Sequence, residues 1–192
     1  MRRAHVDSAV LDGASSTLPL PAAAAHRLFR VLRLHDGDVV ELFDGTGRLA
    51  RGRLVAPDRL EDVTLVSADD ALPPLVVVQA VVRTDKLELV VQKGTELGAA
   101  AFVLFDAERG QVHLGDRADK RVERLTRIAA EAARQAGRAR VPSVSGPEGL
   151  AALAERIGAF AGVCAIGVPG AEDALSEVLA ADPRAAGGLV VV

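Results

Sequence analysis

The feature that most constrains the fold is a pair of apolar segments separated by one charged, helix-like segment. Residues 75–82 are apolar apart from Gln79, and residues 101–105 form a second apolar run. Such runs are typical of strands in a parallel sheet that is covered on both faces. The intervening run 83–98 is polar at its start, carries apolar residues at helical spacing and ends at Gly98. The order strand, helix, strand predicts a parallel α/β unit.

Both ends of this helix carry recognisable signals. Asp85 stands where an N-cap is expected, and Glu88 follows three residues later, as in a capping box. Gly98 is expected to end the helix in the left-handed conformation.

The rest of the C-terminal part continues the alternation of strands and helices. A long helix is expected at 119–136, before Gly137, and a strand at 161–166. Ser145 and Glu148 have capping-box spacing around Pro147, so Gly146 to Gly149 is interpreted as a helix start and not as a ligand loop. The remaining expected elements are helices 147–157 and 172–179 and a strand at 189–192. This pattern predicts a doubly wound parallel sheet.

The first part of the chain has a different, β-rich pattern. One helix is expected at 22–33, followed by strands at 39–43, 48–55 and 63–67 with Gly-rich turns between them. The acidic and diproline segment 69–74 is typical of a domain boundary. The sequence therefore predicts a small barrel or open sheet over 1–70 and an α/β domain over 74–192.

Composition excludes several classes of protein. Aromatic residues make up only 3% of the chain. The sequence therefore argues against a surface on which the bases of single-stranded nucleic acid stack. The net charge is −3, so any nucleic-acid binding must rest on local basic patches. Cys164, the single cysteine, is expected to be buried and fits a reducing cytoplasm. Neither a signal peptide nor a membrane-spanning run is visible, so a cytoplasmic protein without membrane contact is expected.

The usual catalytic signatures are missing from the sequence. The four histidines show no ligand spacing with one another or with Cys164, so no metal site is expected. No strand is followed by a nucleophile elbow, a P-loop or a dinucleotide-binding glycine motif.

Basic residues gather in two places. Lys120, Arg124, Arg127, Arg134 and Arg138 share one face of the long helix with Glu131, whereas the apolar residues form the opposite stripe. This face is either a solvated, ion-paired surface or a surface that follows phosphates, and the residues alone do not decide. A second, weaker group comprises Arg2, Arg3, Arg27, Arg30 and Arg33.

Several segments, in this order and spacing, resemble the RsmE-type 16S rRNA uridine-N3 methyltransferases of the SPOUT superfamily. The strongest is Asp85 to Gly98, and the resemblance covers essentially the whole chain. The other matching segments are Met1 to Arg3, Arg30 to Leu34, Gly37-Asp38, Glu41 to Gly45, Glu108-Arg109, Glu131 to Arg138 and Val141-Pro142.

The resemblance implies a PUA-like β-barrel for RNA docking, followed by a SPOUT-type α/β domain with a trefoil knot. It also implies a homodimer that uses S-adenosyl-L-methionine to methylate uracil N3 in 16S rRNA of the assembled small ribosomal subunit. The expected cofactor wall is Ala165, Ile166, Gly167 and Val192. The expected RNA contacts are Arg2, Arg3, Arg30, Arg33, Arg83, Lys86 and Arg138, with Lys86 and Arg138 nearer the reacting base. Glu88, Glu96, Glu108 and Glu131 are interpreted as ion-pair partners and not as bases, and no catalytic residue is assigned.

The sequence departs from the family at Val192, where a Gly-Pro-Glu-Gly-Gly cofactor loop is expected to begin. We therefore expect a chain supplied without its terminal segment, with the knot incomplete and with weak or no cofactor binding and activity in this form. The main alternative is a non-catalytic RNA-binding or ribosome-associated protein. A small-molecule α/β enzyme is a third class of protein, but the sequence offers no group of catalytic residues that would support it.

Overall fold

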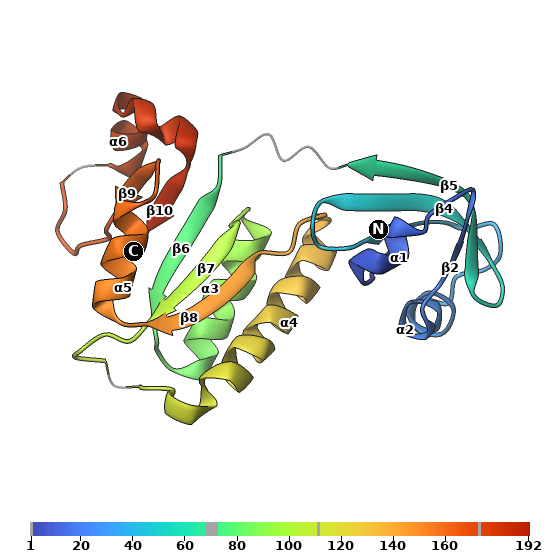
Figure 1. Cartoon of the computed structure of the whole chain (residues 1–192), viewed down its shortest axis with the longest axis horizontal. Helices are drawn as coiled ribbons and strands as arrows, with labels where there is room; N and C mark the ends of the chain where they lie inside the picture. Colours follow the sequence, from blue (N-terminus) through green and yellow to red (C-terminus); the bar gives the residue numbers. More distant parts are fainter. Residues whose placement is uncertain (1, 68–72, 111, 173) are drawn as a thin grey trace. The chain divides into compact units, whose positions relative to one another are not determined.

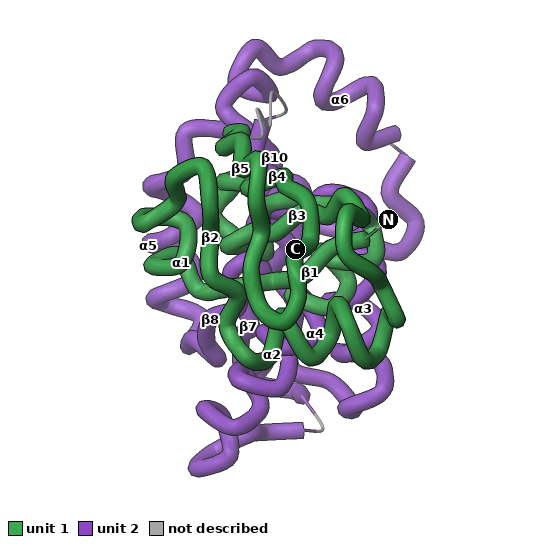
Figure 2. Tube along the Cα trace, turned by 90° about the vertical axis from the view of Figure 1, so that its right-hand side faces the viewer, with its two compact units in different colours: residues 1–70, 130–141 green, residues 71–129, 142–192 purple. Residues whose placement is uncertain are grey.

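The computed structural model describes residues 2–67, 73–110, 112–172 and 174–192 (Figure 1). The chain divides into two compact units, coloured separately in Figure 2: residues 1–70 with 130–141, and residues 71–129 with 142–192. Most of the predicted linker, residues 68–72, lies outside the described residues, so the domain boundary stays a prediction.

Unit 1 is a five-stranded mixed sheet in the order β1-β3-β4-β5-β2. The side chains of Leu28, Leu42, Leu54 and Leu60 are fully buried in its core. The predicted β-rich unit is thus confirmed. Its elements are β1 (Arg3–His5), α1 (Ser8–Asp12), β2 (Thr17–Pro19), α2 (Ala22–Ala25), the π-helix η1 (His26–Val31), β3 (Val39–Phe43), β4 (Arg48–Val55) and β5 (Arg59–Ser67).

Unit 2 is built on a five-stranded sheet in the order β8-β7-β6-β10-β9, and all its neighbouring strands run parallel. The predicted parallel α/β domain is confirmed. Its elements are β6 (Leu75–Ala80), α3 (Thr84–Glu96), β7 (Ala101–Phe105), the 3-10 turn η2 (Gly115–Arg117), α4 (Ala118–Ala136, whose last turns belong to unit 1), β8 (Ser143–Glu148), α5 (Leu150–Gly158), β9 (Val163–Ala165), α6 (Leu175–Ala181), the 3-10 turn η3 (Pro183–Gly187) and β10 (Leu189–Val191).

Helices cover both faces of the unit 2 sheet. A Cβ added at Gly94 of α3 would lie 2.7 Å from the ring of Phe102 in β7, so α3 approaches that face closely. The next residue of β7, Val103, points to the other face and packs with Val190 and with Leu153 of α5. This two-sided burial explains the nearly unbroken apolar strands of the sequence.

Three local predictions are wrong. Asp85 is not the N-cap, because the helix begins at Thr84 after Arg83, and the Asp85 carboxylate pairs with the Arg83 guanidinium. Cys164 is exposed, because β9 pairs only with β10 among the described strands and buries Val163 instead. The strand predicted at 75–82 ends at Ala80.

The helix start predicted at Pro147 is also wrong. Residues 143–148 form β8, which pairs with β7 through an irregularity between Val103 and Phe105. Gly146 has φ +97°, and a Cβ there would lie 2.3 Å from the Leu104 carbonyl oxygen. Gly146 and Pro147 are therefore part of an irregular strand and not of a helix start. Helix α5 begins only at Leu150.

Candidate functional site

The four predicted cofactor residues come together at the carboxyl ends of β9 and β10. These strands pair in parallel with Val191 opposite Ala165. The Val192 N–H donates to the Ala165 carbonyl oxygen at 2.9 Å, and the Gly167 N–H donates to the Val192 carbonyl oxygen at 3.0 Å. In open α/β sheets, ligands bind at this edge of the strands.

The surface of this edge is apolar and open. The side chains of Ile166 and Val168 are 65% and 60% exposed. A Cβ added at Gly167 would meet only the Val192 carbonyl oxygen, at 3.7 Å. Exposed apolar side chains beside an open glycine backbone fit one wall of a site for a flat group with apolar faces, such as adenine.

The first turns after Pro21 position two of the predicted RNA-binding arginines. A π-helical turn replaces the expected α-helix over His26–Val31, with the Leu32 N–H bonded to the Arg27 carbonyl oxygen at 2.9 Å. Arg33 then adopts φ +52°, and the Leu34 N–H returns to the carbonyl of the buried Leu28 at 3.0 Å. This ending directs the chain so that Arg30 and Arg33 line the same hollow.

We call this feature the unit 1 hollow; its volume is about 540 Å³. Besides the two arginines, its lining includes His26, Phe29 and His35, and no acidic residue. The sequence analysis missed these three residues. For His26 and Phe29 the spacing was a usable signal, since positions 26, 29, 30 and 33 recur at helical intervals of three and four.

Arg2 and Arg3 have very different surroundings. Arg2 is half-exposed and pairs with Asp38, whose pKa is held below its usual value by the His35 backbone N–H and by Arg2. Arg3 is 5% exposed; its Nε lies 2.6 Å from Glu41, and its Nη1 donates to the Gly137 carbonyl oxygen. The guanidinium of Arg3 is therefore occupied within unit 1.

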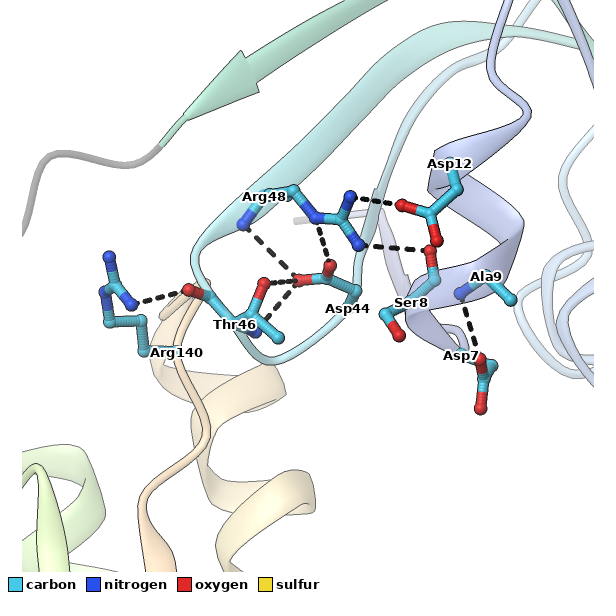
Figure 3. A network of polar contacts seen from close by, with 8 residues as sticks. All are labelled: Asp7, Ser8, Ala9, Asp12, Asp44, Thr46, Arg48 and Arg140. Atoms are coloured by element: carbon cyan, nitrogen blue, oxygen red, sulfur yellow. Dashed lines mark hydrogen bonds and ion pairs between the residues drawn. The ribbon is translucent and has the colours of Figure 1, made fainter.

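The turn between β3 and β4 holds the segment after α4 (Figure 3). Asp44 accepts hydrogen bonds from the Thr46 N–H and hydroxyl, both at 2.8 Å, and from Arg48 Nε at 2.7 Å. Burial opposes ionisation of Asp44, but these bonds outweigh it and hold the pKa of the carboxyl below its usual value. Arg140 donates to the Thr46 carbonyl oxygen at 2.5 Å, and the Val141 N–H donates to the Gly45 carbonyl oxygen at 2.9 Å. The turn that follows the segment Glu41 to Gly45 and the start of the segment Val141-Pro142 are thus joined by direct contacts.

The remaining predicted RNA contacts are divided between the units. Arg83 pairs with Asp85, and the hydrogen bond from Arg83 lowers the pKa of that carboxyl. Lys86 is exposed on the first turn of α3. Arg138 follows the end of α4 in unit 1, where its N–H donates to the Ala133 carbonyl oxygen at 2.8 Å.

Much of the basic face of α4 is ion-paired. Arg127 pairs with Glu123, and Arg134 pairs with Glu131. The hydrogen bond from Arg134 is the main cause that lowers the pKa of Glu131 to about 2. Glu88 and Glu96 also form ion pairs. The interpretation of Glu88, Glu96 and Glu131 as ion-pair partners is therefore confirmed. For Glu108, no ion pair is seen in the described part of the chain.

Among the described residues, neither a metal-binding cluster nor a membrane-spanning helix is found. Within residues 2–67, 73–110, 112–172 and 174–192, no group of three or more His, Cys, Asp or Glu side chains is placed to hold a metal ion. Among the same residues, no helix is both long and apolar enough to cross a membrane.

The fold agrees with comparisons against known protein families. Residues 70–192 match the family described as RNA methyltransferase domain. Residues 20–61 match the family described as RNA methyltransferase PUA domain. The chain belongs to the RNA methyltransferase domain family, with a PUA domain in front of it.

Within this family, the relatives are RsmE-type enzymes. The chain is 35% identical over 150 residues to the ribosomal RNA small subunit methyltransferase E of Bacillus subtilis, a match that covers 75% of this chain and 59% of the relative. It is 35% identical over 132 residues to the enzyme of the same name from Mycobacterium bovis, covering 66% of this chain and 50% of the relative. The chain thus spans between half and three fifths of these curated relatives.

Solved structures also align with this chain over nearly its whole length. The ribosomal RNA small subunit methyltransferase E from Neisseria gonorrhoeae, bound to S-adenosyl methionine, aligns with a TM-score of 0.78 and 26% identity. This alignment covers 100% of this chain and 77% of that one. A hypothetical protein with a crystal structure aligns with a TM-score of 0.78 and 29% identity, covering 99% and 79% of the two chains.

Proposed function

We propose that this chain is part of an enzyme that transfers a methyl group from S-adenosyl-L-methionine to uracil N3 in 16S rRNA of the assembled small ribosomal subunit. The observation that carries the proposal is the open, apolar edge at Ala165, Gly167 and Val192 in a domain of the RNA methyltransferase family. The name of the Bacillus subtilis relative supports the RNA substrate, and the bound cofactor of the Neisseria gonorrhoeae structure supports the methyl donor.

The cofactor would rest on Ala165, Ile166, Gly167 and Val192. Ile166 offers an exposed apolar surface to the adenine, and Gly167 allows the ligand to approach the backbone. S-adenosyl-L-methionine, when bound, would supply an electrophilic methyl group. The role of these four residues is to orient the donor and to exclude water from it.

The RNA side of the reaction needs cations. Uracil N3 becomes a nucleophile when its N–H loses the proton, and the negative charge that develops on the base must be stabilised. Lys86 and Arg138 are proposed for this role. Arg2, Arg30, Arg33 and Arg83 are proposed to contact the RNA backbone, whereas the buried pair with Glu41 leaves Arg3 chiefly a structural role.

The larger assembly is also part of the proposal. We expect a homodimer that works in the cytoplasm on the small ribosomal subunit. We also propose that the 192-residue form binds S-adenosyl-L-methionine weakly or not at all, and tight stoichiometric binding in calorimetry would contradict this.

The test compares matched variants of the full-length gene product. Ile166→Asn places an amide in the proposed apolar wall and is expected to weaken S-adenosyl-L-methionine binding about tenfold in calorimetry. Leu97→Asn, at an 83% exposed position after α3, is the control and should leave binding unchanged. Equal affinities for both variants and the wild type would exclude this edge as the cofactor site.

The RNA arm uses small ribosomal subunits and a labelled methyl donor. Arg30→Glu with Arg33→Glu should weaken subunit binding and reduce its salt dependence, whereas Arg51→Glu with Arg59→Glu changes the charge of unit 1 equally and should have a smaller effect. Methylated uridine is then identified by digestion and mass spectrometry. Salt-dependent binding without methyl transfer would favour the non-catalytic RNA-binding alternative.

A further inference from the structure

A second hollow lies in unit 2, beside the first turns of α4. Its volume is about 350 Å³, in the range of small ligand sites, and it is lined by four cations, Arg117, Lys120, Arg121 and Arg124, together with Thr84 and His113. We call it the unit 2 hollow. Lys120 and Arg124 belong to the basic helix face noted in the sequence, but none of the residues predicted to hold the cofactor or to contact RNA lines this hollow.

The local structure fixes this group of cations. The buried Leu114 anchors the chain just before η2, and η2 leads directly into α4. Arg121 is only 15% exposed at its side chain; its guanidinium donates to the Thr84 hydroxyl and lies 3.6 Å from Glu88. One wall of the hollow is therefore held in place before any ligand binds.

The charges in the hollow are not balanced. Glu88 contacts both Arg121 and Arg124, with 2.7 Å between its Oε1 and Arg124 Nε. Arg117 and Lys120 are exposed and make no ion pair with any described residue. Farther along α4, Arg127 and Arg134 each have a carboxylate partner. The two cations of this segment that have no ion pair with a described residue, Arg117 and Lys120, thus lie just before α4 and in its first turn.

We propose that the unit 2 hollow binds the phosphodiester backbone of the RNA substrate. Planar guanidinium groups, two of them held by Glu88, together with an exposed lysine suit phosphate oxygens. This inference rests on the proposed function, since it gives the methyltransferase unit its own contact with RNA in addition to the unit 1 hollow. It also answers the question left open by the sequence: the start of α4 follows phosphate, and the later part of its basic face is ion-paired.

The test is the salt dependence of small-subunit binding by the full-length gene product. Arg117→Gln with Lys120→Gln removes two exposed cations and should lower the magnitude of the slope of log K against log salt by about 1.5, and binding about tenfold. Arg127→Gln, on the same helix but paired with Glu123, is the control and should change neither quantity measurably. Circular dichroism verifies that each variant remains folded.

The outcomes separate this inference from the proposed function. If the wild type binds with a steep salt slope and the double variant keeps that slope, the unit 2 hollow does not contact RNA. If the wild type shows no salt-dependent binding, the proposed function itself is wrong. Inorganic phosphate serves as a second probe. It could raise the melting temperature of the wild type and not that of the double variant, while the two proteins bind RNA equally. In that case the hollow binds a small anion and the RNA assignment is wrong.

Discussion

Arg2 and Arg3 are neighbours in the sequence, yet the fold gives their side chains opposite environments. Arg2 extends into solvent beside Asp38, whereas Arg3 is buried between Glu41 and the Gly137 carbonyl. A surface ion pair contributes little to stability, but removing one partner of a buried pair leaves the other charge uncompensated.

We therefore expect Arg3→Ala to lower the free energy of unfolding by about 3 kcal/mol, because Glu41 loses its buried partner. Arg2→Ala, the matched control, should lower it by about 1 kcal/mol or less. Urea unfolding followed by circular dichroism measures both. Equal losses for the two variants would show that Arg3 does not hold unit 1 together.

Single residues also mark the limit of what the sequence predicted. The pattern of basic and apolar residues was sufficient to place Arg30 and Arg33 on one feature and to place Gly167 at a strand end. It could not reveal that Arg3 is buried, because its partner Gly137 lies far along the chain. Local rules equally failed at Asp85, where an ion pair with Arg83 took the place of a cap.

At the scale of elements, hydrophobic periodicity predicted most of the regular structure. The strands at 39–43, 48–55 and 101–105 have the predicted bounds, and α4 begins one residue before its predicted start. The short elements β1, α1 and β2 were not predicted, because segments of three to five residues carry too little periodicity. Strand β8 was missed because Gly146 and Pro147 resemble a helix start, and only pairing with β7 explains them.

Helix α3 offers a test of element packing at its glycine. In an isolated helix, Gly→Ala stabilises by up to about 1 kcal/mol. At Gly94 the added methyl would lie 2.7 Å from the ring of Phe102, so we expect Gly94→Ala to destabilise the protein by about 1–3 kcal/mol. Gly158→Ala in α5 meets no atom within 4 Å and should be neutral or stabilising. Thermal unfolding compares the two, and a stabilised Gly94→Ala variant would contradict the close packing of α3 on β7.

At the scale of the whole molecule, each unit has a core of its own. Val190 is 3% exposed in the core of unit 2, where it packs with Val78, Val103 and Leu153. Val190→Ala should cost about 2 kcal/mol through lost burial and a residual cavity. Hydrogen exchange should become faster in β6, β7 and β10 and remain unchanged in β3 and β4. Val66→Ala, at a 46% exposed position in β5, is the control. If Val190→Ala accelerated hydrogen exchange equally in both units, the two units would unfold together.

The strand order of unit 2 also determines when its five-stranded sheet can form during translation. β10 is the last described strand to leave the ribosome, yet it lies between β6 and β9, with Leu189 opposite both Leu75 and Val163. Strands β6, β7 and β8 can pair as soon as they are synthesised, but β9 has no neighbour in the sheet until β10 arrives. Pairing β10 with β6 closes a loop that contains all the residues between Ala80 and Leu189. Closing a loop of this length carries an entropic cost and slows folding. One edge of β6 therefore stays without its β10 partner while the residues between Ala80 and Leu189 are synthesised, a stage at which aggregation competes with folding.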